Sequence, residues 1–197
     1  MRLVAFVAFA LLLVYSAAAV NICIPSCTRQ MSAEIAALVA VAPTSAAAQV
    51  SSEQAAFGKA TVASALRNLN KPYVFGSVGP DSFDCSGLVQ YAFGLNGVAL
   101  PRTSTEQASF QGGLLVSSRE GLIPGDIVYF TNPGHTGIFV GYDADTGSKY
   151  TFVSASGNEG EPNGKVKKSR LDTDYWSNVQ PFRWGVRIPY ALAQKAG

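Results

Sequence analysis

The spacing of hydrophobic residues changes part of the way along the chain. In residues 53–69 the apolar side chains recur at the spacing of one helix face. From residue 127 onward they alternate with polar residues, which is typical of strands. Helices followed by strands predict an α+β domain in which N-terminal helices pack on one antiparallel sheet.

Five segments carry the strand pattern, and turns rich in Gly, Asn, Asp and Pro separate them. We therefore expect a sheet of about five strands, at residues 127–130, 135–142, 149–154, 165–170 and 184–188. Four aromatic residues near the C-terminus are predicted to belong to the core: Tyr175, Trp176, Phe182 and Trp184.

Helix starts are marked by capping residues. Asp84 is a good N-cap for a helix over about residues 85–93, which puts Cys85 in the first helical turn. Two capping boxes predict two further starts: Ser51 with Gln54 for the helix at 53–69, and Thr103 with Glu106 for a short helix.

Composition limits the chain to one main domain. It has 197 residues, of which 48% are hydrophobic and 14% charged, enough for one core and little more. The formal net charge is only +2, and no long run of like charge occurs, so nucleic acid is not an expected partner.

The N-terminus has the layout of an export signal. Arg2 precedes an apolar stretch at residues 3–15, and small residues follow up to Ala19, where we predict cleavage. The alternative is a membrane anchor, but the apolar stretch is short for a span of roughly 20 residues. We expect a secreted protein without a membrane span, extracellular or in a lumenal digestive compartment. The predicted parts are a signal peptide at 1–19, a leader and linker at 20–52 and a catalytic domain at 53–197.

Three cysteines suggest two different roles. Cys23 and Cys27 are close enough to form a small disulfide loop in an oxidising compartment. Cys85 remains, and burial statistics alone favour an inert thiol. However, the free N–H groups and dipole of a helix start favour a thiolate, although the adjacent Asp84 opposes it. Full activation of Cys85 would therefore need a nearby histidine.

His135 is the sole histidine and follows a turn at the start of a predicted strand. A lone histidine is more often structural. In a chain that also has a cysteine at a helix start, it becomes a candidate general base for that cysteine. If Tyr142 pairs with Gly147 across the following turn, Ser154 lies opposite His135 and would orient its ring. The equally weighted alternative is that Ser154 is an ordinary strand residue and that water or a backbone carbonyl orients the ring. Asn158 and Glu159 are further candidates for orienting it. One histidine makes a metal site improbable, and no cofactor is expected.

Five blocks of sequence, in order between about residues 66 and 188, resemble the NlpC-type peptidoglycan endopeptidase family. The most specific block runs Asp-Cys-Ser-Gly-Leu-Val from Asp84. The blocks are Tyr73-Val74-Phe75-Gly76, residues 84–90, residues 100–107, residues 124–130 and residues 135–141.

The resemblance implies a papain-like thiol hydrolase that acts on peptidoglycan stem peptides as a monomer, usually at the bond between γ-D-glutamate and a diamino acid. Cys85 matches the nucleophile and His135 the base. One departure is that the family most often has histidine, Asn, Gln or Glu at the third position, where this chain offers Ser154. Four further residues match positions at the cleft for oxyanion or substrate binding: Tyr73, Asp84, Ser86 and Arg102.

Structural roles compete with several of these assignments. Asp84 would bind a substrate amine or only cap its helix, and Arg102 would clamp a substrate carboxylate or pair with Asp84. Tyr73 would help hold the oxyanion or pack on the core. Asp126 is expected to close the turn before its strand. For the whole protein, the rival hypotheses are a wall-binding module without catalysis and an amidase or acyltransferase with another substrate.

Overall fold

The structure, a computed structural model, describes residues 50–131, 134–157 and 164–196. The predicted signal peptide, residues 20–49 of the leader and linker, and the Cys23–Cys27 pair therefore lie outside the described residues. Within them, six antiparallel strands form one sheet in the order β1-β6-β2-β3-β4-β5. The strands are β1 (Leu114–Val116), β2 (Ile127–Phe130), β3 (Thr136–Asp143), β4 (Ser148–Ser156), β5 (Lys165–Arg170) and β6 (Phe182–Arg187).

The predicted strands are all present, and the sheet has one more. β1 was missed because its three residues are too few to show alternation, and two of them are exposed apolar residues. It adds an edge strand beside β6.

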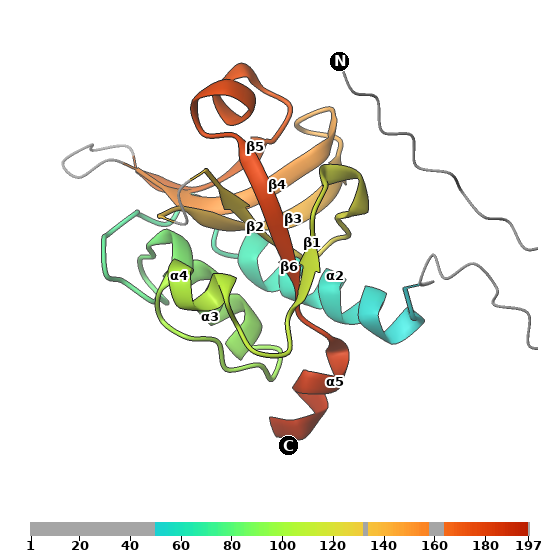
Figure 1. The fold of residues 1–197 in the computed structure, drawn as a ribbon. Coiled ribbons are helices and arrows are strands. Elements are labelled where there is room, and N and C mark those ends of the chain that lie inside the picture. Colours follow the sequence, from blue (N-terminus) through green and yellow to red (C-terminus); the bar gives the residue numbers. More distant parts are fainter. Residues whose placement is uncertain (1–49, 132–133, 158–163, 197) are drawn as a thin grey trace, which may run out of the picture. The chain divides into compact units, whose positions relative to one another are not determined.

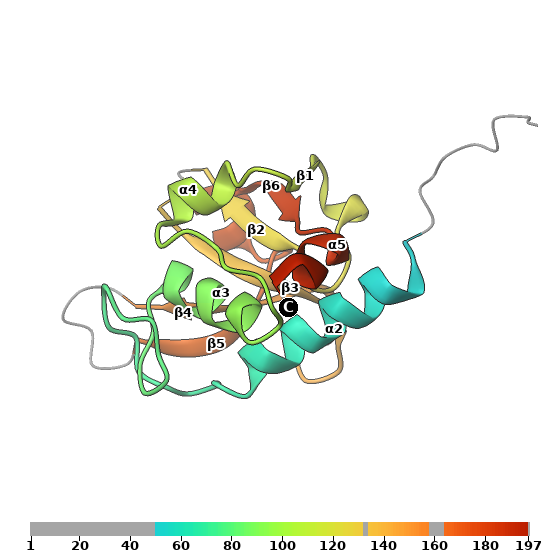
Figure 2. The same ribbon diagram turned by 90° about the horizontal axis from the view of Figure 1, so that it is seen from below.

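The helices gather on one face of the sheet (Figures 1 and 2). Those long enough to cover it are α2 and α3, and α3 packs against β3 and β4. None of the helices in the described parts of the chain is long and apolar enough to cross a membrane. The helical segments are α2 (Ser52–Leu66), α3 (Cys85–Gly94), α4 (Ser104–Ala108) and α5 (Tyr190–Ala193), with short turns η1 (Arg119–Gly121), η2 (Tyr175–Val179) and η3 (Gln194–Ala196).

The predicted caps are present, with one difference. Thr103 and Glu106 form a full capping box at α4. At α2 the Ser51 hydroxyl accepts from the Gln54 N–H at 3.1 Å, but the Gln54 side chain does not return to Ser51. It bonds instead to the backbone of Ile188 and Tyr190, which ties α2 to the C-terminal segment. A contact distant in sequence has replaced the second half of the box.

The core divides into two clusters, one on each face of the sheet. The helical face buries Leu88, Val89, Ala92 and Phe93 of α3, as their spacing predicts. The other face is covered by η2, and its cluster includes Phe130, Phe152 and Trp176. Because strand side chains alternate between faces, β4 turns Val153 and Ala155 towards the helices and Ser154 and Ser156 to the opposite side. The α+β, papain-like architecture is confirmed.

Candidate active site

The first turn of α3 is fixed by Asp84. Its Oδ1 accepts from the Gly87 N–H at 2.7 Å, which makes Asp84 the N-cap. Position 87 must be glycine, because a Cβ there would lie 2.1 Å from the carbonyl oxygen of Ser77. Cys85 is thereby held at the helix start, where backbone N–H groups are free of intrahelical partners.

Asp84, Ser86 and Arg102 form a structural network beside this turn. The Arg102 guanidinium donates to both Asp84 carboxylate oxygens, at 3.2 and 2.5 Å, and to Ser86 Oγ at 2.9 Å. Asp84 also accepts from the Gly76 N–H. None of the three network residues lines the pocket that contains Cys85 and His135. The contacts therefore match the structural alternatives, capping for Asp84 and pairing with Asp84 for Arg102.

His135 lies just before β3 and packs against two aromatic rings that also contact each other. Its ring is stacked on Trp176, with centroids 5.5 Å apart and an angle of 18°, and lies 5.6 Å from the Phe130 ring. Its Nε2 is 3.3 Å from the hydroxyl of Ser156. The imidazole is therefore packed against Trp176 on one face and contacts Ser156 through Nε2.

The expectation that His135 lies opposite Ser154 is wrong. The hydroxyl that contacts the ring belongs to Ser156, at the end of β4. Ser154 is fully buried behind it, with its Oγ 2.8 Å from the Ser156 Oγ. A chain of hydrogen-bonding contacts therefore runs from the imidazole to the Ser156 hydroxyl and on to the Ser154 hydroxyl.

The hairpin turn between β3 and β4 explains this difference. The strands close with Asp143 opposite Ser148, and not with Tyr142 opposite Gly147 as expected from the turn. Moving each strand end by one residue changes the partners of Ile138 and Phe139 by two, while Gly141 pairs with Thr151 at an irregularity in the register. A change of two residues keeps the same face of the strand, so Ser156 takes the expected position.

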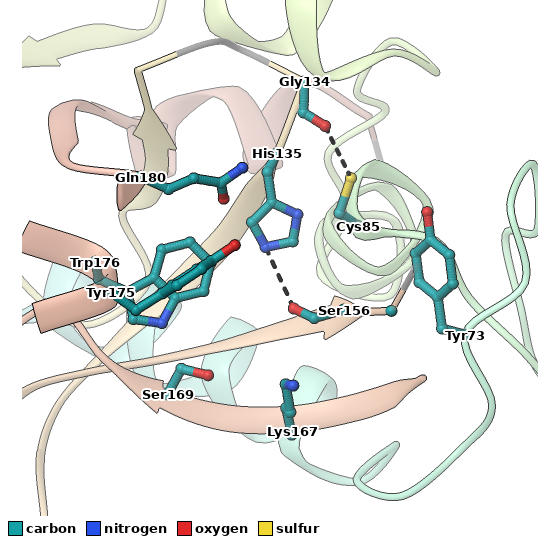
Figure 3. A pocket seen from close by; sticks show the side chains of 11 residues that line it. Tyr73, Cys85, Gly134, His135, Ser156, Lys167, Ser169, Tyr175, Trp176 and Gln180 are labelled. Carbon is teal, nitrogen blue, oxygen red and sulfur yellow. Dashed lines mark hydrogen bonds between the residues drawn. The ribbon is translucent and has the colours of Figure 1, made fainter. Parts of the chain in front are cut away.

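Cys85 and His135 line one pocket with a volume of about 500 Å³ (Figure 3). Cys85 is 9% exposed, and its thiol donates to the Gly134 carbonyl oxygen over 3.9 Å. The His135 nitrogen that does not contact Ser156 lies on the side of Cys85 in Figure 3. An open pocket therefore contains a thiol and an imidazole that face each other.

Burial keeps both groups neutral at rest. It raises the pKa of the Cys85 thiol, and the negative charge of Asp84 raises it further, while nearby backbone N–H groups oppose the change. Burial also lowers the pKa of His135 to about 4, with a smaller contribution from the positive charge of Lys167. At neutral pH the free site therefore holds a thiol and a neutral imidazole, the form of histidine that can accept a proton.

Tyr73 lines the pocket next to Cys85. In Figure 3 its hydroxyl lies on the Cys85 side of the pocket. Its ring rests against Gly157 and Gly164, where a Cβ would approach within 3.2 and 3.1 Å of Tyr73 carbon atoms. Tyr73 is therefore a pocket residue rather than only a core residue.

The residues that line the rest of the pocket were not predicted as site residues from the sequence. β5 contributes Lys167 and Ser169, and the segment around η2 contributes Tyr175, Trp176 and Gln180. Tyr175 is 49% exposed, so its assignment to the core is wrong, whereas Trp176 serves both core and pocket. The alternation of β5 put Lys167 and Ser169 on one face, but nothing local indicated which residues that face would meet.

Other expected site residues have different positions. Asp126 closes its turn, because its Oδ2 accepts from the Ile123 N–H at 2.9 Å, and it also pairs with Arg187. Asn158 and Glu159 lie outside the described residues. Among the described residues, no cluster of three His, Cys, Asp or Glu side chains could hold a metal ion.

Comparisons with known proteins agree with this geometry. The chain is 38% identical over 104 residues to a probable endopeptidase p60 of Listeria welshimeri, covering 49% of this chain and 19% of that protein. It is 38% identical over 135 residues to the gamma-DL-glutamyl hydrolase of Bacillus subtilis, covering 67% of this chain and 30% of that protein. The chain thus spans less than a third of the length of these two relatives.

Among solved structures, NlpC1 of Trichomonas vaginalis matches with a TM-score of 0.53 and 28% identity, over 66% of this chain and 43% of that one. The family model described as NlpC/P60 family matches residues 70–184, more than half of the chain. That range contains Cys85, His135 and Ser156, the residues that meet at the pocket. The chain belongs to the NlpC/P60 family.

Proposed function

We propose that this chain is a secreted cysteine endopeptidase that hydrolyses peptidoglycan stem peptides. The observation that carries the proposal is that Cys85, at the start of α3, and His135, stacked on Trp176, face each other in one pocket. The NlpC/P60 membership and the relatives named endopeptidase and gamma-DL-glutamyl hydrolase support the reaction class. We further propose the bond between γ-D-glutamate and a diamino acid as the one cleaved.

In the first half of the reaction, the Cys85 sulfur attacks the carbonyl carbon of the amide. His135 takes the thiol proton on the nitrogen that faces Cys85, so a carbon–sulfur bond forms while the carbonyl oxygen becomes an oxyanion. The backbone N–H of Cys85 and the hydroxyl of Tyr73 are the proposed donors to that oxyanion. His135 then gives its proton to the leaving amine, and the carbon–nitrogen bond breaks.

In the second half, water hydrolyses the thioester. His135 accepts a proton from the water, the new carboxylic acid leaves, and Cys85 recovers its thiol. Ser156 accepts from Nε2–H throughout and so keeps the other nitrogen free to act as the base. A hydroxyl carries no charge, so it stabilises the imidazolium less than a carboxylate would.

The test is cleavage of defined muropeptides by the purified protein, with fragments identified by mass. We expect wild type to release a γ-D-glutamyl product and Cys85→Ala to release none while still binding the uncleaved peptide. Retained binding shows that the variant is folded. Undiminished turnover by Cys85→Ala would refute the role of Cys85. Binding without cleavage by wild type would instead support the wall-binding module.

A further inference from the structure

Lys167 is a basic residue in the wall of the pocket. Of the pocket-lining residues that the structure describes, Lys167 is the one lysine or arginine, and none is Asp or Glu. Lys167 lies on β5 opposite Ser154, and its side chain is exposed. In Figure 3 its ammonium nitrogen lies on the Ser156 side of the strand.

The neighbouring lysine on the same strand behaves differently. Lys168 points to the other face and donates to Asp143 and Asp145 at 2.7 and 2.6 Å. Within residues 50–131, 134–157 and 164–196, Lys167 makes no such ion pair or hydrogen bond. Among the described residues nothing neutralises its charge, which can pair with an anionic molecule in the pocket.

This charge opposes the catalytic base when the pocket is empty. The Lys167 ammonium disfavours the imidazolium form of His135 and so lowers the pKa of that ring. A cation beside a base that must accept a proton is unfavourable unless a bound anion compensates for it. An anionic group of the substrate would both pair with Lys167 and remove this disadvantage.

The proposed substrate has an anionic group near the cleaved bond. A γ-glutamyl amide uses the side-chain carboxyl of glutamate, so the α-carboxylate remains free at the other end of the same short carbon chain. We propose, on the basis of the function proposed above, that Lys167 binds this α-carboxylate and so selects stem peptides whose D-glutamate is not amidated.

The experiment compares two stem peptides that differ only at that group, the α-carboxylate and the α-carboxamide. For wild type we expect kcat/KM to be at least about tenfold higher for the carboxylate, and the ratio to fall at high salt, because salt screens an exposed ion pair. For Lys167→Met we expect the ratio to fall to about twofold or less, and Lys167→Arg should restore most of it.

The two separate rates distinguish direct binding from an effect through His135. Loss of a carboxylate contact lowers kcat/KM for the carboxylate substrate, whereas removing the charge next to His135 raises kcat/KM for the carboxamide substrate, which brings no anion to compensate that charge. Lys59→Met, on the exposed side of α2, is the matched control and should keep the wild-type ratio.

A wild-type ratio near one, or an unchanged ratio in Lys167→Met, would overturn this inference and leave the proposed function standing. If wild type cleaves neither peptide, the proposed function itself fails, and this inference fails with it.

Discussion

At the scale of single residues, reactivity depends on how Cys85 and His135 share one proton. Burial and Asp84 raise the pKa of the thiol, and burial lowers the pKa of the imidazole, so the neutral pair dominates between these two values. The substrate-free site is therefore unlike a preformed thiolate–imidazolium pair. Proton transfer would accompany attack on the substrate.

This state predicts how Cys85 reacts with an alkylating reagent. The thiolate is the reactive form, and a raised pKa means that its fraction at neutral pH is small. The rate of iodoacetamide labelling should therefore rise with pH into the alkaline range. In Ser156→Asp a carboxylate next to Nε2 favours the imidazolium, which in turn favours the thiolate, so labelling at pH 7 should be about tenfold faster.

The measurement is the labelled fraction of the peptide that contains Cys85, followed by mass against pH, with Ser156→Ala as the uncharged control. A plateau of the wild-type rate already reached below pH 6 would contradict the neutral pair. Equal rates at pH 7 in Ser156→Asp and Ser156→Ala would contradict the contact between Ser156 and the ring.

The sequence was informative about single residues where the signal was local. Cys85 follows its own N-cap, and His135 is the sole histidine, so both could be predicted. Ser156 could not be chosen over Ser154, because the two share a face and only the turn geometry selects between them. Lys167 and Trp176 required knowledge of how β5 and η2 meet β4 and His135, which no local pattern contains.

At the scale of elements, the start of α3 depends on Asp84. This carboxylate caps the helix and accepts from the Gly76 N–H and from Arg102, and it is only 5% exposed. Removing it leaves several donors without their partner at once, which costs more than loss of a cap alone.

We expect Asp84→Ala to lower the free energy of unfolding by about 3 kcal/mol, since a cap contributes roughly 1 kcal/mol and the partly buried ion pair adds to it. The melting temperature should then fall by about 6–12 °C. Glu106→Ala, in the exposed capping box of α4, is the matched control and should cost about 1 kcal/mol or less. Calorimetry showing equal losses in the two variants would contradict the central position of Asp84.

Caps were predictable because each depends on residues three positions apart, as at Asp84 and Thr103. Gln54 differs because its amide reaches a segment more than 130 residues away. β1 was missed because three residues cannot show a period. Tyr175 was misplaced because it lies in a helical turn at the surface and not on a strand.

At the scale of the whole molecule, the fold brings three distant parts of the chain to one end of the sheet. Cys85 lies at the start of α3, and His135 lies just before β3. Residues of β4, β5 and η2 line the rest of the pocket. The order of helices and strands predicted the α+β class, because that class depends only on which elements occur and in what order. The composition of the pocket depends instead on sheet order, which places β3, β4 and β5 side by side.

The proposed reaction requires that Cys85 forms a covalent bond to the acyl half of the substrate. Acid quenching of the protein with a γ-D-glutamyl stem peptide, followed by intact mass and peptide mapping, measures this directly. We expect an adduct of the acyl fragment on the peptide that contains Cys85, absent in Cys85→Ala. Steady turnover with the adduct on another side chain would contradict it.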